Sequence, residues 1–172
     1  MDDYLNGIRD ELDTVKSNDE FYRRLDMLVA QLSKLCPNGG AISDQKSADV
    51  MTSLVFLLRE GYDKGFNMVV CCEMKPAGGK VMNANMSYMQ STVGRVYSFY
   101  TTKEKAQRAV GDDHWAEIPV RFVMNNLFNR KEAVAFTFNR DYGKSEGMII
   151  VPMMYLLPVF QGKMPKPEGF RE

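Results

Sequence analysis

The chain has 172 residues, of which 45% are hydrophobic and 26% charged, a composition typical of a globular protein with a substantial core. Its 22 basic residues are balanced by 22 acidic ones, so it lacks the basic surplus of nucleic-acid binders and membrane-surface proteins, although a local basic patch is compatible with this balance. The opening residues are acidic, so no secretory signal is predicted. No apolar run approaches the roughly 18 residues needed to cross a bilayer, so no membrane span is predicted. We therefore expect a cytoplasmic protein that binds neither nucleic acid nor membranes.

The first 60 residues are predicted to be helical. Residues 5–15 carry apolar side chains at spacings of three and four, which places these side chains on one helix face. Ser17 and Glu20 form an S-x-x-E capping box that opens a second amphipathic helix, and a CPNGG segment ends it. The two apolar faces either pack as an antiparallel pair or leave one face for a second chain. Residues 47–60 predict a third helix, with Gly61 as its left-handed C-cap.

A β-hairpin is predicted next. Residues 66–74, FNMVVCCEM, form a compact run typical of a buried strand. The following KPAGGK segment lacks the spacing of a phosphate-binding loop, and no helix follows it, so it predicts a turn. Residues 81–89 are mostly polar after their first two positions and predict the partner strand, at a sheet edge or irregular.

The next segment predicts a strand, a short helix and a second helix. Residues 94–101 predict the strand, and Thr101 begins another capping box with Glu104 that opens a helix ending at Gly111. The connection that follows can hold a short strand. Pro119 suits the first position of the second helix, where its missing N–H is not needed.

The last elements are predicted to complete the sheet. Residues 133–138 alternate small and large apolar side chains, so both faces are expected to be buried and the strand to lie centrally. Residues 148–151 predict a short strand, and Pro152 opens a final helix through Leu157. These elements predict an α+β fold, with a mixed β-sheet of about five strands packed with helices.

Three segments are expected in the domain organisation. Residues 1–62 form an N-terminal helical segment that packs on the main domain of residues 63–160. Residues 161–172, rich in proline and charge, form an extended C-terminal tail. We find no internal repeat and no linker long enough to separate two folded domains.

Four motifs carry a resemblance to a known family: VYSFYTTKEKAQRA, EIPVRFVMNNLF, AVAFTFN and MIIVPMMYLLPV. In their order and arrangement they resemble the N-terminal domain of the SseB family, named for enhanced serine sensitivity. The resemblance covers roughly the last two-thirds of the chain, with Asn139–Arg140 where the family commonly has an Asn-Pro pair. It implies an α+β domain of bacterial cytoplasmic proteins with no agreed enzymatic activity.

Two places are candidate binding sites. Asn139, Arg140, Asp141 and Tyr142 follow a central strand, where loops of α/β sheets often gather ligand contacts, although Asn and Asp in such a turn also cap their own backbone. His114, the only histidine, stands beside Trp115 and is either a general base oriented by a carboxylate or a surface-loop residue. The charged residues 102–108 are expected to form a solvated helix face.

The thiols and the lone histidine offer no metal chemistry. Three cysteines, two of them adjacent at Cys71 and Cys72, predict reduced thiols, and an apolar strand lowers their reactivity. One histidine cannot supply the usual two- or three-histidine metal site, and no C-x-x-C motif is present. We expect no metal site and no cofactor.

The function expected from these patterns is that of a non-enzymatic binding or interaction domain, acting through a protein partner or self-association. Two alternatives stay open. One is a small enzyme using His114 with Asp112, Asp113 or Glu117. The other is an immunity protein against a bacterial toxin, because such proteins are small, cytoplasmic and built from unmatched α/β patterns.

Overall fold

The computed structural model describes residues 15–36, 42, 44–77, 81–140 and 149–163. Within these residues the fold is α+β, as predicted, with five α-helices, one 3-10 helix and a mixed sheet of seven strands. The elements in chain order are α2 (Asn18–Leu35), α3 (Gln45–Lys64), β1 (Asn67–Ala77), β2 (Val81–Met86), β3 (Tyr88–Gln90), β4 (Arg95–Tyr100), α4 (Lys103–Val110), η2 (Asp112–His114), β5 (Trp115–Pro119), α5 (Val120–Phe128), β6 (Ala133–Phe138), β7 (Ile149–Pro152) and α6 (Met153–Phe160). The predicted helix over residues 5–15 and most of the predicted tail lie outside the described residues.

The sheet has one parallel pair, β4 with β6, among otherwise antiparallel pairs. Its main path runs β2-β1-β4-β6-β7, with β3 paired to β4 and β5 paired to β1. The hairpin of β1 and β2 and the central place of β6 were both predicted. The sheet has two more strands than expected because the polar run of residues 81–90 divides into β2 and β3, and because the connection after η2 pairs along β1 as β5.

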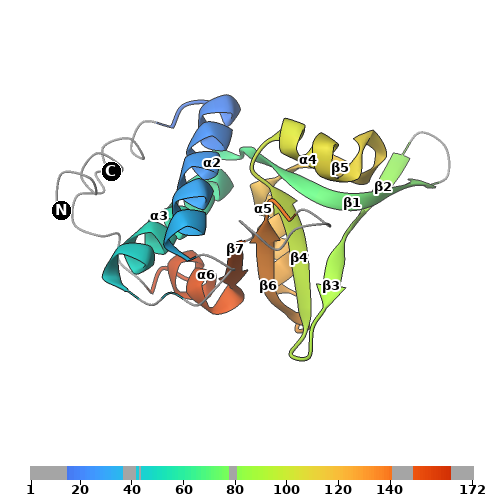
Figure 1. Cartoon of the computed structure of the whole chain (residues 1–172). Helices are drawn as coiled ribbons and strands as arrows, with labels where there is room; N and C mark the ends of the chain where they lie inside the picture. The colour runs from blue at the N-terminus through green and yellow to red at the C-terminus, as the bar shows by residue number, and fades with distance from the viewer. Residues whose placement is uncertain (1–14, 37–41, 43, 78–80, 141–148, 164–172) are drawn as a thin grey trace.

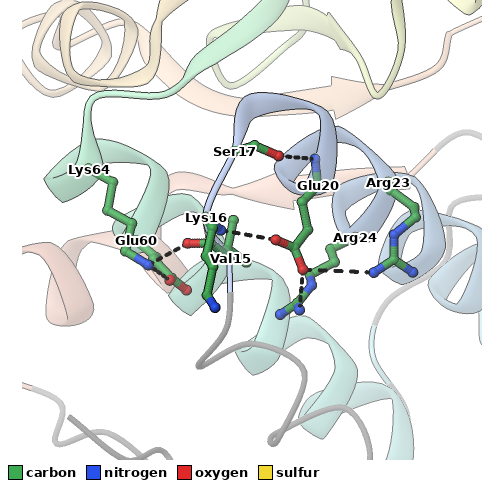
Figure 2. Close-up of polar contacts among 8 residues, drawn as sticks. All are labelled: Val15, Lys16, Ser17, Glu20, Arg23, Arg24, Glu60 and Lys64. Atoms are coloured by element: carbon green, nitrogen blue, oxygen red, sulfur yellow. Dashed lines mark hydrogen bonds and ion pairs between the residues drawn. The ribbon is translucent and has the colours of Figure 1, made fainter.

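The N-terminus of α2 is capped by a variant of the predicted capping box (Figure 2). The Ser17 hydroxyl accepts a hydrogen bond from Glu20 N at 3.2 Å, as expected. The Glu20 carboxylate reaches Lys16 N at 3.0 Å, one residue before the expected Ser17 N. It also pairs with the buried guanidinium of Arg24, Oε1 to Nη2 at 2.7 Å. The carboxylate therefore both satisfies an N–H at the helix start and neutralises a buried charge.

Helix α3 is longer than predicted, and Gly61 does not end it. The helix continues to Lys64, and Gly65, at φ +74°, is the left-handed C-cap. Gly61 lies inside the helix, and Phe21 packs against it. A Cβ at this position would stand 2.7 Å from the Phe21 ring. The glycine is therefore a close-packing site between α2 and α3. The expected domain boundary at residue 62 falls in the last turn of this helix.

Two other helix starts also differ from the sequence prediction. Pro119 is the N-cap of α5 and the last residue of β5, one position before the expected place. Helix α6 begins after Pro152 and runs through Pro158 to Phe160, beyond the expected end at Leu157. None of the helices described here is long and apolar enough to cross a membrane.

One hydrophobic core joins the helices to the sheet. Figure 1 shows α2, α3 and α6 grouped beside the sheet that contains β4 and β6. Side chains of all these elements belong to one continuous buried cluster. Three phenylalanine rings of β4 and β6 pack against one another within it in tilted and edge-on orientations, with centroids 5.2–6.2 Å apart: Phe99, Phe136 and Phe138. This core fixes the place where β4 and β6 end.

Candidate functional site

The carboxyl ends of β4 and β6 lie at one edge of the sheet because the two strands are parallel. Phe99 stands opposite Phe138 in the ladder, so the chain leaves β4 at Thr101 and β6 at Asn139 side by side. Thr101 leads directly into α4 (Figure 1). Strand ends of this kind are where α/β sheets commonly gather ligand contacts. We call this region the β4–β6 corner.

Asn139 has an unusual backbone conformation that its own hydrogen bonds explain. Its φ is +55°, the one positive value of a non-glycine residue among those the structure describes, and asparagine tolerates this left-handed region better than most residues. Its N–H donates to Phe99 O at 2.9 Å. Its side-chain Oδ1 accepts from Thr101 N, also at 2.9 Å. The residue therefore joins the two strand ends and satisfies an N–H that would otherwise be left at the end of β4.

Thr101 belongs to this corner and does not cap α4. The cap is Thr102, whose hydroxyl accepts from Lys105 N at 3.2 Å, so the predicted pairing of Thr101 with Glu104 is wrong by one residue. The Thr101 hydroxyl is buried within hydrogen-bonding distance of Asn139 Oδ1 and of Asp26 Oδ1. Having one proton, it donates to one of these oxygens at a time.

Asp26 connects the corner to α2. Its Oδ1 accepts from the Thr101 hydroxyl and forms an ion pair with the Lys105 ammonium on α4. The Lys105 and Asp26 side chains are 40% and 33% exposed. Because Asp26 holds it, the Lys105 head group has a defined position without any ligand.

A pocket of about 220 Å³ opens at the corner. Its described lining comes from the end of β4, the side of α4 and the end of β6: Tyr100, Lys105, Arg108, Ala109, Asn139 and Arg140. Three of these residues are cationic and none is acidic. Arg108 is exposed and makes no hydrogen bond or ion pair with the residues the structure describes. Tyr100 is buried and donates from its hydroxyl to Arg140 O at 3.1 Å, which fixes the Arg140 backbone.

The predicted site residues fall in two separate places. Asn139 and Arg140 line the pocket, and Asp141 and Tyr142 lie outside the described residues. His114 is exposed at the end of η2, and Trp115 begins β5 opposite Cys71. Neither of these two lines the pocket.

No carboxylate in the described part of the chain is hydrogen-bonded to His114. Glu117, one of the expected partners, instead accepts from the Tyr22 hydroxyl at 2.8 Å and pairs with Lys103 at 3.0 Å. Partial burial raises the pKa of the Glu117 carboxyl, but the hydrogen bonds from Lys103 and Tyr22 outweigh it and hold this pKa below its ordinary value. Asp112 and Asp113 are exposed. The Trp115 indole N–H is buried without an acceptor among the described residues.

The thiols are buried, as predicted. Cys71 and Cys72 are 3% and 0% exposed. Burial, with a smaller contribution from the neighbouring Cys71, raises the pKa of the Cys72 thiol to about 11. The reactive thiolate is therefore scarce at neutral pH. Within the described residues no group of three or more His, Cys, Asp or Glu side chains is placed to hold a metal ion.

Sequence reasoning missed the cations of α4. Residues 102–108 were expected to be a solvated helix face, yet Lys105 and Arg108 line the pocket. They stand three residues apart and so share one side of the helix. That spacing, next to a strand end, was the available signal. The roles of Asp26 and Thr101 had no such signal, because α2 and α4 are distant in sequence.

Comparison with known proteins found no match among family models, curated proteins or solved structures.

Proposed function

We propose that this chain is a non-enzymatic binding domain of the SseB-like type, which works in the bacterial cytoplasm by engaging a protein partner at the β4–β6 corner. The observation that carries the proposal is the cationic pocket, with Lys105, Arg108 and Arg140 in its lining and no acidic side chain among its described residues. Charge of one sign in a concave site attracts a partner of opposite charge.

The resemblance to the SseB family supports the same conclusion. Two of the four motifs that carry it, VYSFYTTKEKAQRA and AVAFTFN, supply most of the pocket. The residues in question are Tyr100, Lys105, Arg108, Ala109 and Asn139. The resemblance implies no agreed enzymatic activity, which fits a site built for binding.

A different protein is a better partner for this corner than a second copy of the chain. In a twofold dimer the same patch lies on both subunits. A dimer formed through the corner would therefore bring two cationic pockets together, and like charges at close range oppose association. An anionic surface on another protein meets no such penalty.

The test is affinity capture from a lysate of the source cells, run with wild type, Arg108→Glu and Lys103→Glu. Lys103 is the matched control, because it lies on the same helix but pairs with Glu117 and does not line the pocket. We expect one or more proteins to be retained by wild type and Lys103→Glu and lost by Arg108→Glu. Identical captured sets for all three baits would contradict the proposal. Light scattering of wild type alone would reveal self-association.

A further inference from the structure

We propose that a hollow between the C-terminal halves of α3, α5 and α6 binds an extended peptide segment of a partner protein. The segment places one apolar side chain in the hollow and pairs the peptide groups beside it with two side-chain amides. We call this site the α3–α6 hollow, and rings of Tyr62, Phe128 and Phe160 are among its walls. It shares no described lining residue with the β4–β6 corner, so the inference goes beyond the proposed function.

The walls of the hollow are fixed by contacts between the rings themselves. Phe160 meets Tyr62 and Phe128 edge to face, with ring centroids 5.4 and 5.1 Å apart. All three rings are partly buried and pack against the core. The volume of the hollow is about 400 Å³, within the roughly 300–1,000 Å³ of sites that take small ligands. A preformed space of this kind accepts an apolar side chain at a low entropic cost.

The apolar surface extends beyond the hollow along α6. None of the eight residues of this helix is charged. Leu157 lines the hollow and is 38% exposed, and Met154, three residues earlier, is 71% exposed. Residues three apart lie on the same side of a helix, so the two side chains form one apolar strip. A ligand that covers this strip is longer than the hollow, which favours a peptide over a small molecule.

The described lining favours an uncharged side chain. Its one charged residue is Arg59, whose Nε donates to Asp63 Oδ2 at 2.8 Å and whose Nη1 donates to Phe160 O at 3.0 Å. Arg121 lies over the Tyr62 ring, 5.3 Å from its centroid, but is not part of the described lining. A charged group that entered the hollow would lose its water and find the lining cation already paired.

Two side-chain amides line the hollow with hydrogen-bonding capacity to spare. Asn125 Oδ1 accepts from the Tyr62 hydroxyl at 3.1 Å, whereas its NH2 group has no partner among the described residues. The Gln161 amide, at the C-cap of α6, makes no hydrogen bond within the described part of the chain. Such an amide both donates and accepts, as does a peptide group. An extended segment has peptide groups free for this pairing, whereas those of a helix are bonded internally.

The experiment titrates the full chain with N-acetyl-phenylalanine N-methylamide, a probe with one apolar side chain between two peptide groups. NMR follows the backbone amides of α5 and α6 and the side-chain NH2 signals of Asn125 and Gln161, and we expect saturable shifts of both NH2 signals. The apparent Kd should rise about fivefold in Asn125→Asp and in Gln161→Glu, which keep the side-chain size and an acceptor oxygen but lose the N–H donors.

Asn126→Asp is the matched control for this titration. Asn126 is the neighbouring residue on α5, its amide donates to Phe122 O, and it does not line the hollow. The substitution introduces the same charge as Asn125→Asp, so the apparent Kd should change less than about twofold if the lost donors, and not the added charge, matter. Equal affinity of the probe for wild type and Asn125→Asp overturns the inference.

Two further probes test the class of ligand. N-acetyl-glycine N-methylamide lacks the apolar side chain and should bind about tenfold more weakly or less. Benzyl alcohol has a ring but no peptide group and should leave the two NH2 signals unshifted. Equal affinity of the phenylalanine and glycine probes overturns the inference. Benzyl alcohol that binds as tightly as the phenylalanine probe also overturns it, because the hollow then takes small aromatic molecules and does not read the peptide groups.

Discussion

Two regions of this molecule contain the same types of charged residue but use them for different purposes. The first is the α2–α3 junction, formed by Val15, Lys16, Glu20, Arg24, Glu60 and Lys64 (Figure 2). There the Lys64 ammonium donates to Val15 O at 2.6 Å and to Glu60 at 2.5 Å, and Arg24 pairs with Glu20. The second is the β4–β6 corner, where Arg108 has no such partner among the described residues and lines a pocket instead.

The difference separates cations that hold the fold from cations available to a ligand. At the junction, the backbone hydrogen bond from Lys16 and the charges of Arg24 and Arg23 hold the pKa of Glu20 below its ordinary value despite some burial. This marks a carboxylate whose charge is used within the chain. At the corner Asp26 binds the Lys105 ammonium and the Thr101 hydroxyl, whereas Arg108 lines the pocket and has no such partner among the described residues. Changes at the junction should therefore cost stability, and a change at Arg108 should cost binding.

The largest loss of stability is expected from Phe21→Ala, in the packing between α2 and α3. Phe21 is fully buried, touches Gly61 and packs against Phe66 with ring centroids 5.7 Å apart. Its removal should lower the free energy of unfolding by about 3–5 kcal/mol, as measured by urea denaturation. The control Phe122→Ala removes a ring that is 57% exposed and should change stability by less than about 0.5 kcal/mol. Equal effects of the two variants would contradict the assigned core.

Asn139→Ala tests whether the stability of the chain depends on the hydrogen bond and the left-handed backbone of Asn139 at the corner. The variant loses the acceptor for Thr101 N and places alanine in a left-handed conformation, so we expect a loss of about 2–4 kcal/mol. Asn139→Gly loses only the acceptor and should be more stable than Asn139→Ala by about 1 kcal/mol. Urea denaturation of both variants measures this difference. The reverse order would show that Asn139 is not held in the left-handed region.

Gly61→Ala tests the close approach at the junction. The new Cβ would stand 2.7 Å from the Phe21 ring, so the ring or the helix must move. Overpacking of this kind costs about 1–3 kcal/mol, whereas alanine in an open helical site would stabilise the chain through better helix propensity. A higher melting temperature for Gly61→Ala would therefore contradict this packing.

Glu117 links α2 to α4, and its effect on stability is expected to depend on pH. It joins Tyr22 of α2 to Lys103 of α4, and its pKa is lower in the folded chain than its ordinary value of 4.5. A group with a depressed folded pKa contributes stability that is present above the unfolded pKa and is lost as pH falls through the folded pKa. Glu117→Gln should cost less than about 1 kcal/mol at pH 7, because the pair is partly exposed. The cost should shrink below pH 4.5, as followed by unfolding at several pH values. A cost that is constant with pH would contradict the ion pair.

The sequence predicted the elements of this fold better than its site, for physical reasons. Apolar periodicity and capping residues act locally, so α2, the β1–β2 hairpin and the central strand β6 were readable. The capping roles predicted for Gly61 and Thr101 were wrong. Each residue suits a cap locally, but contacts with distant residues, Phe21 for Gly61 and Asp26 for Thr101, determine its actual role. Asn139 and Arg140, which line the pocket, were predicted as site residues because they follow a strand. Lys105 and Arg108 became recognisable as pocket residues only once α4 was placed beside the end of β6.

Thermal unfolding of Arg108→Glu, run beside affinity capture with the same variant, tests the central claim, that Arg108 serves a partner and not the fold. The variant should melt as wild type does, because surface changes stay within about 0.5 kcal/mol, yet it should lose the proteins that wild type captures. A variant destabilised as severely as Phe21→Ala, or one that captures the same proteins as wild type, would contradict the claim.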